Sequence, residues 1–117
     1  MLGAIAGDII GSPHEFESMK SVDFPLFAAG SRFTDDSVLT VATAFTLMTD
    51  GDYAANYRLF GRLYPLAGYG GKFAEWLAGE DASPYGSYGN GSGMRVSPVG
   101  FALDEEKDVL AEAERSA

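Results

Sequence analysis

Five consecutive residues, Phe33-Thr34-Asp35-Asp36-Ser37, decide the fold of this chain because they predict where a long helix begins. Thr34 is the expected N-cap, and Asp35 and Asp36 fall in the first turn, where the helix dipole favours negative charge. Asp50-Gly51 predicts the end of this helix. The positions between carry apolar side chains at the i, i+3, i+4 and i+7 spacing of one helix face: Val38, Val41, Ala42 and Phe45.

The same Thr-Asp-Asp run has two interpretations that the local pattern leaves open. In the first, Thr34 and the two aspartates only cap and charge the helix, as such residues commonly do. In the second, the neighbouring carboxylates repel each other and a divalent cation relieves that repulsion. Hydroxyl and carboxylate oxygens are hard ligands, which suit Mg²⁺, Mn²⁺ or Ca²⁺ better than a soft metal.

Helical patterns dominate the rest of the sequence. A long loop is predicted at residues 12–33, and Pro98 requires a kink or a new start after residues 94–96. Because no alternating strand pattern stands out, the sequence predicts an all-α fold in a single domain. Further helices are predicted at residues 2–10, 52–64, 73–79 and from 104 onward.

The composition limits the possible functions. With 117 residues, 46% of them hydrophobic, the chain suits one small domain with a modest core. The absence of cysteine excludes disulfides, zinc-thiolate sites and cysteine nucleophiles. A net charge of −9 argues against affinity for nucleic-acid backbones or anionic membranes. No apolar run is long enough to span a membrane and no signal peptide is evident, so we expect a soluble, cytoplasmic protein.

The predicted first helix, residues 2–10, is almost wholly apolar. Gly3, Gly7 and Gly11 recur every four residues, and this stripe of small residues predicts close packing against another backbone. Asp8 is the one charged residue of the helix. A hydrogen-bonded structural role is the more common role of such an aspartate.

A glycine-rich segment, Ser87-Tyr88-Gly89-Asn90-Gly91-Ser92, runs into the helical pattern Met94-Arg95-Val96. A glycine-rich turn that opens a helix presents backbone N–H groups to an anion. A flexible linker explains the same composition equally well. No strand precedes the segment, as the dinucleotide-binding pattern requires, so the bare pattern leaves both interpretations open.

Four segments form a set in their order and spacing. They are residues 3–12 (GAIAGDIIGS) with Glu15, residues 33–37 (FTDDS), residues 70–73 (GGKF) with Trp76, and residues 86–100 (GSYGNGSGMRVSPVG). Together they resemble the ADP-ribosylglycohydrolase family, which includes the dinitrogenase reductase-activating glycohydrolases and the ADP-ribosyl-acceptor hydrolases. The resemblance runs over essentially the whole chain.

The resemblance implies that this chain is the N-terminal part of an all-α bundle, with a binuclear Mg²⁺ or Mn²⁺ site at the bottom of a cleft. It implies a hydrolase that cleaves the N- or O-glycosidic bond between ADP-ribose and a modified protein side chain. Carried over by position, Thr34, Asp35 and Asp36 are metal ligands, and Glu15 has a catalytic or gating role at the metal site. Arg95 is expected to hold the glycine-rich segment. The residues implied to wrap the diphosphate and ribose are Gly86, Ser87, Tyr88, Gly89, Asn90 and Gly91.

The chain also departs from the family pattern. Family members are longer, and their second half supplies a further metal-binding segment, an Asp-x-Asp followed by Thr or Ser. Asp104 and Asp108 have the wrong spacing for that segment, and the Thr-His segment that follows the last helix in the family is absent. We therefore expect a truncated domain, residues 1–117, whose binuclear Mg²⁺ or Mn²⁺ centre is incomplete.

Three functions remain open at this point: an ADP-ribosyl hydrolase, an inactive half-site that binds a divalent cation or ADP-ribose, and a small acidic helical interaction protein. The expected partner is ADP-ribose or an ADP-ribosylated protein, with no nucleic acid and no membrane. A truncated bundle is also expected to expose apolar surface. We therefore expect self-association or a complementing chain.

Overall fold

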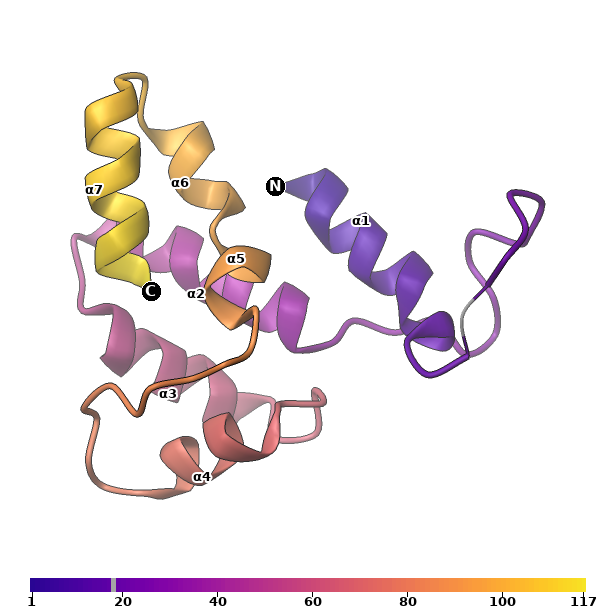
Figure 1. Ribbon diagram of the computed structural model, residues 1–117, viewed down its shortest axis with the longest axis horizontal. Coiled ribbons are helices and arrows are strands. Elements are labelled where there is room, and N and C mark those ends of the chain that lie inside the picture. Colours follow the sequence, from indigo (N-terminus) through magenta and orange to yellow (C-terminus); the bar gives the residue numbers. More distant parts are fainter. Residues whose placement is uncertain (18) are drawn as a thin grey trace.

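The computed structural model describes residues 1–17 and 19–117, and every regular element in these ranges is a helix (Figure 1). The prediction of an all-α fold is confirmed. No helix in the described ranges is both long and apolar enough to cross a membrane. The elements are α1 (Leu2–Gly11), the 3₁₀ turn η1 (Ser12–His14), α2 (Asp35–Thr49), α3 (Tyr53–Leu63), α4 (Gly71–Ala78), α5 (Gly91–Arg95), α6 (Ser97–Ala102) and α7 (Glu106–Ser116).

Helix α2 is the central element, and it contacts α1, α3, α5 and α6. Figure 1 shows α1, α6 and α7 above it and α3 and α4 below. The helix begins as predicted, because Thr34 is its N-cap and the Thr34 hydroxyl accepts the backbone N–H of Asp36 at 3.4 Å. It ends as predicted too, with Asp50 in the left-handed conformation at a φ of 49°.

The buried face of α2 matches the predicted apolar stripe only in part: Val38 and Ala42 are buried as predicted. Val41 and Phe45 are 38% and 42% exposed, whereas Thr43 and Thr46 are fully buried. Each threonine hydroxyl donates to the backbone carbonyl four residues earlier, at 2.9 and 2.8 Å. Because these bonds satisfy the hydroxyls, burying the threonine side chains costs little free energy. A prediction from the spacing of apolar residues therefore misses them.

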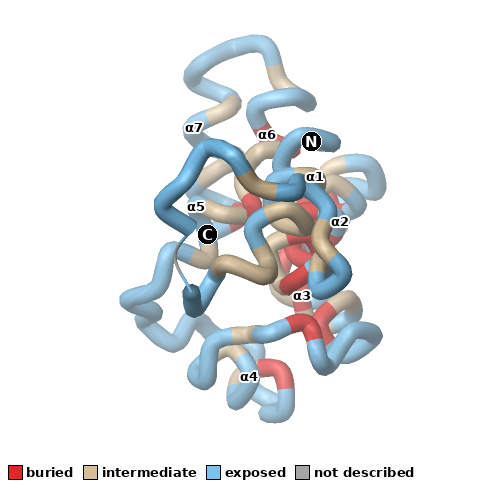
Figure 2. Tube along the Cα trace, turned by 90° about the vertical axis from the view of Figure 1, so that its right-hand side faces the viewer, coloured by how far each residue is buried: buried red, intermediate tan, exposed pale blue. Residues whose placement is uncertain are grey.

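The core lies between α2 and α3 (Figure 2). Its buried centre consists of Leu39, Ala42, Tyr53 and Tyr57. Aromatic side chains of α3 thus form part of the core, while Tyr64, which follows that helix, is 46% exposed. The Tyr57 hydroxyl lies 3.0 Å from the Thr43 hydroxyl and donates to the Ser116 carbonyl at 3.1 Å, so it ties α3 to α7.

Helix α1 packs less than its sequence predicts. None of its residues is buried, and Leu2 is 81% exposed. A Cβ atom added at Gly3, Gly7 or Gly11 would meet nothing within 4 Å, so the glycine stripe contacts no backbone in the described part of the chain. The expectation of self-association or a complementing chain stays a prediction.

Helices α3 and α4 meet at a glycine. Gly61 is buried, and a Cβ atom there would lie 2.6 and 2.8 Å from the two methyl carbons of Leu77. Leu77 is itself buried, at 7% exposure. The side-chain hydrogen of glycine therefore allows α4 to lie close against α3, which brings α4 to the edge of the site described below.

We predict that Gly61→Ala destabilises the protein by about 1–2 kcal/mol, because the clash with Leu77 outweighs the higher helix propensity of alanine. Gly100→Ala is the matched control, since Gly100 lies in α6 with open space where its Cβ would be. It should stabilise the protein by about 0.5–1 kcal/mol. Urea unfolding measures both changes, and equal midpoints for the two variants would contradict the close approach.

Candidate functional site

The Asp8 carboxylate joins α1 to the start of α2. Its Oδ2 atom accepts the backbone N–H groups of Thr34 and Ser37, at 2.8 and 3.1 Å. The hydroxyls of the same two residues also donate to Asp8, with Thr34 Oγ1 2.5 Å from Asp8 Oδ1. These N–H groups have no partner within the helix, so Asp8 satisfies them from outside. The structural role predicted for Asp8 is confirmed.

The two consecutive aspartates face different cavities, because neighbouring residues on a helix point roughly 100° apart. Asp36 lines a cavity of about 410 Å³ together with Thr34 and Glu15, here called the small cavity. Asp35 lines a separate cavity of about 630 Å³, here called the large cavity. Met94 lines both and forms a shared wall. The structure thus brings Glu15, Thr34 and Asp36 together and directs Asp35 to the neighbouring space.

The acidic groups at this end of α2 are poorly neutralised. Burial, followed by the charges of Asp36, Glu15 and Asp8, raises the pKa of Asp35 from 3.8 to about 6. Burial, followed by the charges of Asp8 and Glu15, also raises the pKa of Asp36. A cation placed among these groups would lower both pKa values, because it stabilises the ionised form.

The loop after α3 covers one side of Asp35. The Asp35 backbone N–H donates to the Ala67 carbonyl at 2.9 Å. Gly68 follows with a φ of +100°, and a Cβ there would lie 3.8 Å from Asp35 Oδ1. The next residue, Tyr69, has a buried hydroxyl with no hydrogen-bond partner among the described residues. Burial, then the charge of Asp35, raises the pKa of Tyr69 to about 12.

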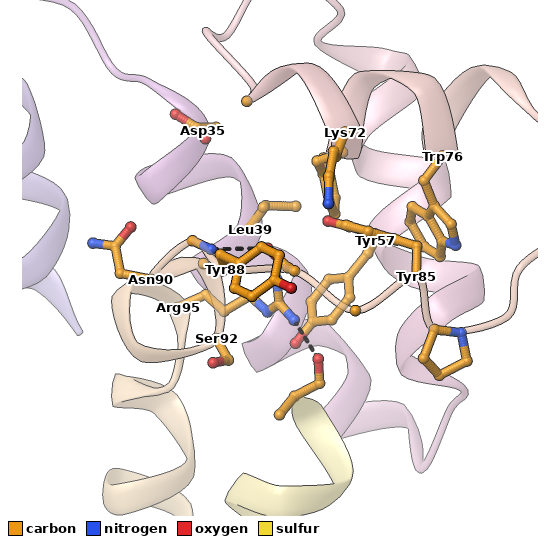
Figure 3. Close-up of a pocket in the computed structure, with 18 of the residues that line it drawn as sticks. Asp35, Leu39, Tyr57, Lys72, Trp76, Tyr85, Tyr88, Asn90, Ser92 and Arg95 are labelled. Atoms are coloured by element: carbon orange, nitrogen blue, oxygen red, sulfur yellow. Dashed lines mark hydrogen bonds between the residues drawn. The ribbon is translucent and has the colours of Figure 1, made fainter.

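The glycine-rich segment forms one wall of the large cavity (Figure 3). Its backbone turns at Gly86, whose φ of +64° favours glycine. Lys72, Trp76 and Tyr85 line the same cavity, although sequence patterns indicated no role for them beyond a place in or beside the recognised segments. The six residues expected to wrap a ligand all line it: Gly86, Ser87, Tyr88, Gly89, Asn90 and Gly91.

Arg95 holds the end of this segment in place. Its side chain is 7% exposed and its guanidinium lies 4.2 Å from the centre of the Tyr57 ring. The Nη2 atom donates to the carbonyls of Ser116 and Ala117, each at 3.1 Å. Arg95 therefore fastens α5 to α3 and to the end of α7, which agrees with the expected holding role.

Comparison with known proteins bears directly on this arrangement. A family model described as ADP-ribosylglycohydrolase matches residues 1–117. The chain belongs to the ADP-ribosylglycohydrolase family. No solved structure matches it significantly. The match spans both cavities and all four segments singled out in the sequence.

The donor set of this ADP-ribosylglycohydrolase chain fits a hard divalent cation in type. Thr34, Asp36 and Glu15 offer hydroxyl and carboxylate oxygens around the small cavity. In the described ranges, however, no three His, Cys, Asp or Glu side chains gather closely enough to hold a metal ion. Thr34, Asp36 and Glu15 therefore amount to a partial ligand set.

We predict that Asp8→Asn destabilises the protein by about 2 kcal/mol. The substitution removes the negative charge that accepts four hydrogen bonds from Thr34 and Ser37, and it places an NH₂ donor against donors of those residues. Urea unfolding is the measurement. Asp104→Asn removes one exposed charge elsewhere and should change the midpoint little. An Asp8→Asn midpoint equal to that of Asp104→Asn would contradict the bridging role.

The raised pKa of Asp35 predicts a pH dependence in buffer free of divalent cations. Because the folded-state value of about 6 exceeds the ordinary 3.8, the native state binds more protons between these values. The stability from Asp35 is therefore fully present below about pH 4 and lost as the pH rises through 6. Asp35→Asn should gain stability relative to wild type between pH 4 and 7. Melting curves of both proteins, with Asp104→Asn as charge control, measure this difference, and a constant gap across the range would contradict it.

Proposed function

We propose that this ADP-ribosylglycohydrolase chain binds ADP-ribose in the large cavity and a divalent cation, Mg²⁺ or Mn²⁺, at the start of α2. The observation that carries the proposal is that the glycine-rich segment and Asp35 line the large cavity. Met94 separates it from the small cavity, which Glu15 and Asp36 line. The activity that follows is hydrolysis of the N- or O-glycosidic bond between ADP-ribose and a protein side chain.

An acidic chain binds an anionic ligand only if local groups outweigh its net charge of −9. Backbone N–H groups in a glycine-rich turn are such groups, because they approach phosphate oxygens without side-chain obstruction. Residues 86–90 are exposed along the cavity wall, which supports contact between their backbone and a diphosphate.

The small cavity supplies the groups for the chemical step. The Thr34 hydroxyl donates to Asp8 and accepts the Asp36 N–H, which leaves one lone pair for a cation. A bound divalent cation would polarise ribose hydroxyls and make a coordinated water more acidic. Glu15, which lines this cavity, would steer the attacking water or take its proton as the water adds to the anomeric carbon, and would return that proton to the departing side chain as the glycosidic bond breaks.

Binding without cleavage is the second candidate. It is favoured by the finding that no three potential metal-binding side chains of the types His, Cys, Asp and Glu gather in the described part of the chain. Release of free ADP-ribose from an ADP-ribosylated peptide, followed by mass spectrometry, separates the two candidates.

We predict that ADP-ribose binds with measurable heat when Mg²⁺ or Mn²⁺ is present and much more weakly in EDTA. Asp36→Asn should reduce the gain in ADP-ribose affinity that the cation provides at least about tenfold, because it removes one of the few carboxylates beside the Thr34 hydroxyl. Isothermal titration calorimetry provides the measurement, and Asp104→Asn provides the control, since this exposed residue lines neither cavity.

Absence of ADP-ribose binding by wild type with either cation would contradict the proposal. If, in addition, Asp35→Asn left both cation binding and thermal stability unchanged, a small acidic interaction protein would become the better description.

A further inference from the structure

We propose that Lys72 is the cationic ligand of the large cavity and that it binds an anionic group of the ligand, such as the diphosphate of ADP-ribose. This inference rests on the proposed function and adds a residue to it. Lys72 is the second residue of α4, and its side chain points into the cavity toward the loop that carries Tyr85 and Tyr88 (Figure 3).

The charges around the cavity single out Lys72. Among the described residues that line it, the charged side chains are Asp35, Lys72 and Arg95. Arg95 is buried, at 7% exposure; its Nη2 donates to the carbonyls of Ser116 and Ala117, and its guanidinium lies over the ring of Tyr57, while its Nε has no partner among the described residues. Lys72 is exposed and forms no ion pair with any residue that the structure describes. Among the described lining residues, its ammonium is therefore the solvent-exposed positive charge of the cavity.

The contact that Lys72 does make is weak enough to be exchanged. Its Nζ atom lies 5.1 Å from the centre of the Tyr88 ring. Tyr88 is 98% exposed, and at such exposed sites a cation–π contact contributes little compared with a hydrogen bond from an ammonium to a phosphate oxygen. A phosphate that enters the cavity would thus compete well for the ammonium.

The walls around Lys72 suit a ligand with both an anionic and a flat aromatic part. The glycine-rich backbone of residues 86–91 lines the cavity together with Lys72. Trp76 and Tyr85 line it as well, and the centres of their rings lie 6.3 Å apart. Backbone N–H groups and an ammonium recognise phosphate oxygens, and the ring of Tyr85, which is 38% exposed, offers a surface on which a base can stack. A nucleoside diphosphate group matches this combination.

The test compares ADP-ribose with adenosine, which keeps the base and a ribose but has no phosphate. Calorimetry measures ADP-ribose, and saturation-transfer NMR measures the weaker nucleoside. Lys72→Met should weaken ADP-ribose binding about tenfold, whereas Lys72→Arg, which keeps the charge, should stay within about threefold of wild type. Neither variant should change adenosine binding more than about twofold. Lys107→Met is the control, because Lys107 lies on α7 beside Asp108, outside the cavity.

Three outcomes would overturn the proposal, and they are distinguishable. If wild type binds ADP-ribose and Lys72→Met binds it equally well, Lys72 is no ligand. If Lys72→Met weakens adenosine and ADP-ribose by the same factor, Lys72 acts only by holding Tyr88. If wild type itself binds no ADP-ribose, the proposed function fails and the role of Lys72 fails with it. Melting curves of the variants establish that each is folded.

Discussion

The bond network of Asp8 is the constraint on which the rest of this structure depends. One carboxylate from α1 accepts four hydrogen bonds at the start of α2, two from backbone N–H groups and two from hydroxyls. Helix α1 buries none of its residues, so this polar contact does much to fix where α1 lies. It also fixes the first turn of α2, and with it the directions of Asp35 and Asp36. The Asp8 carboxylate therefore both holds the start of α2 in place and adds a negative charge beside Asp35 and Asp36.

Helical geometry then divides the site in two. Adjacent residues point in different directions, so Asp36 joins Thr34 and Glu15 around the small cavity while Asp35 faces the large one. Burial and neighbouring carboxylates raise the pKa of both aspartates, because no nearby positive charge among the described residues stabilises their ionised forms. In the function proposed above, backbone N–H groups of the glycine-rich segment and the Lys72 ammonium attract an anionic ligand to the large cavity, despite the net charge of −9.

The supports of the large cavity come from residues distant in sequence. Gly61 lets α4 approach α3, and α4 carries Lys72 and Trp76. Arg95 ties α5 to α3 and to the end of α7. A change at either of these contacts would shift α4 relative to the glycine-rich segment, which faces it across the large cavity. We therefore expect variants at these contacts to change both the stability of the protein and its affinity for the proposed ligand.

The sequence by itself determined the helical elements, the caps of α2 at Thr34 and Asp50, the family, and the segments that line the two cavities, because local backbone chemistry and motif spacing specify them. It placed Val38 and Ala42 correctly on the buried face of α2 but missed the buried threonines, whose hydroxyls are satisfied within the helix, and it was wrong about the packing of the α1 glycines. Only the tertiary structure decided that Asp8 caps a helix that begins 27 residues later, that Asp35 and Asp36 face different cavities, and that Lys72 meets the glycine-rich segment. These relations join residues far apart in the chain, and a contact across space leaves no periodic signal in the sequence.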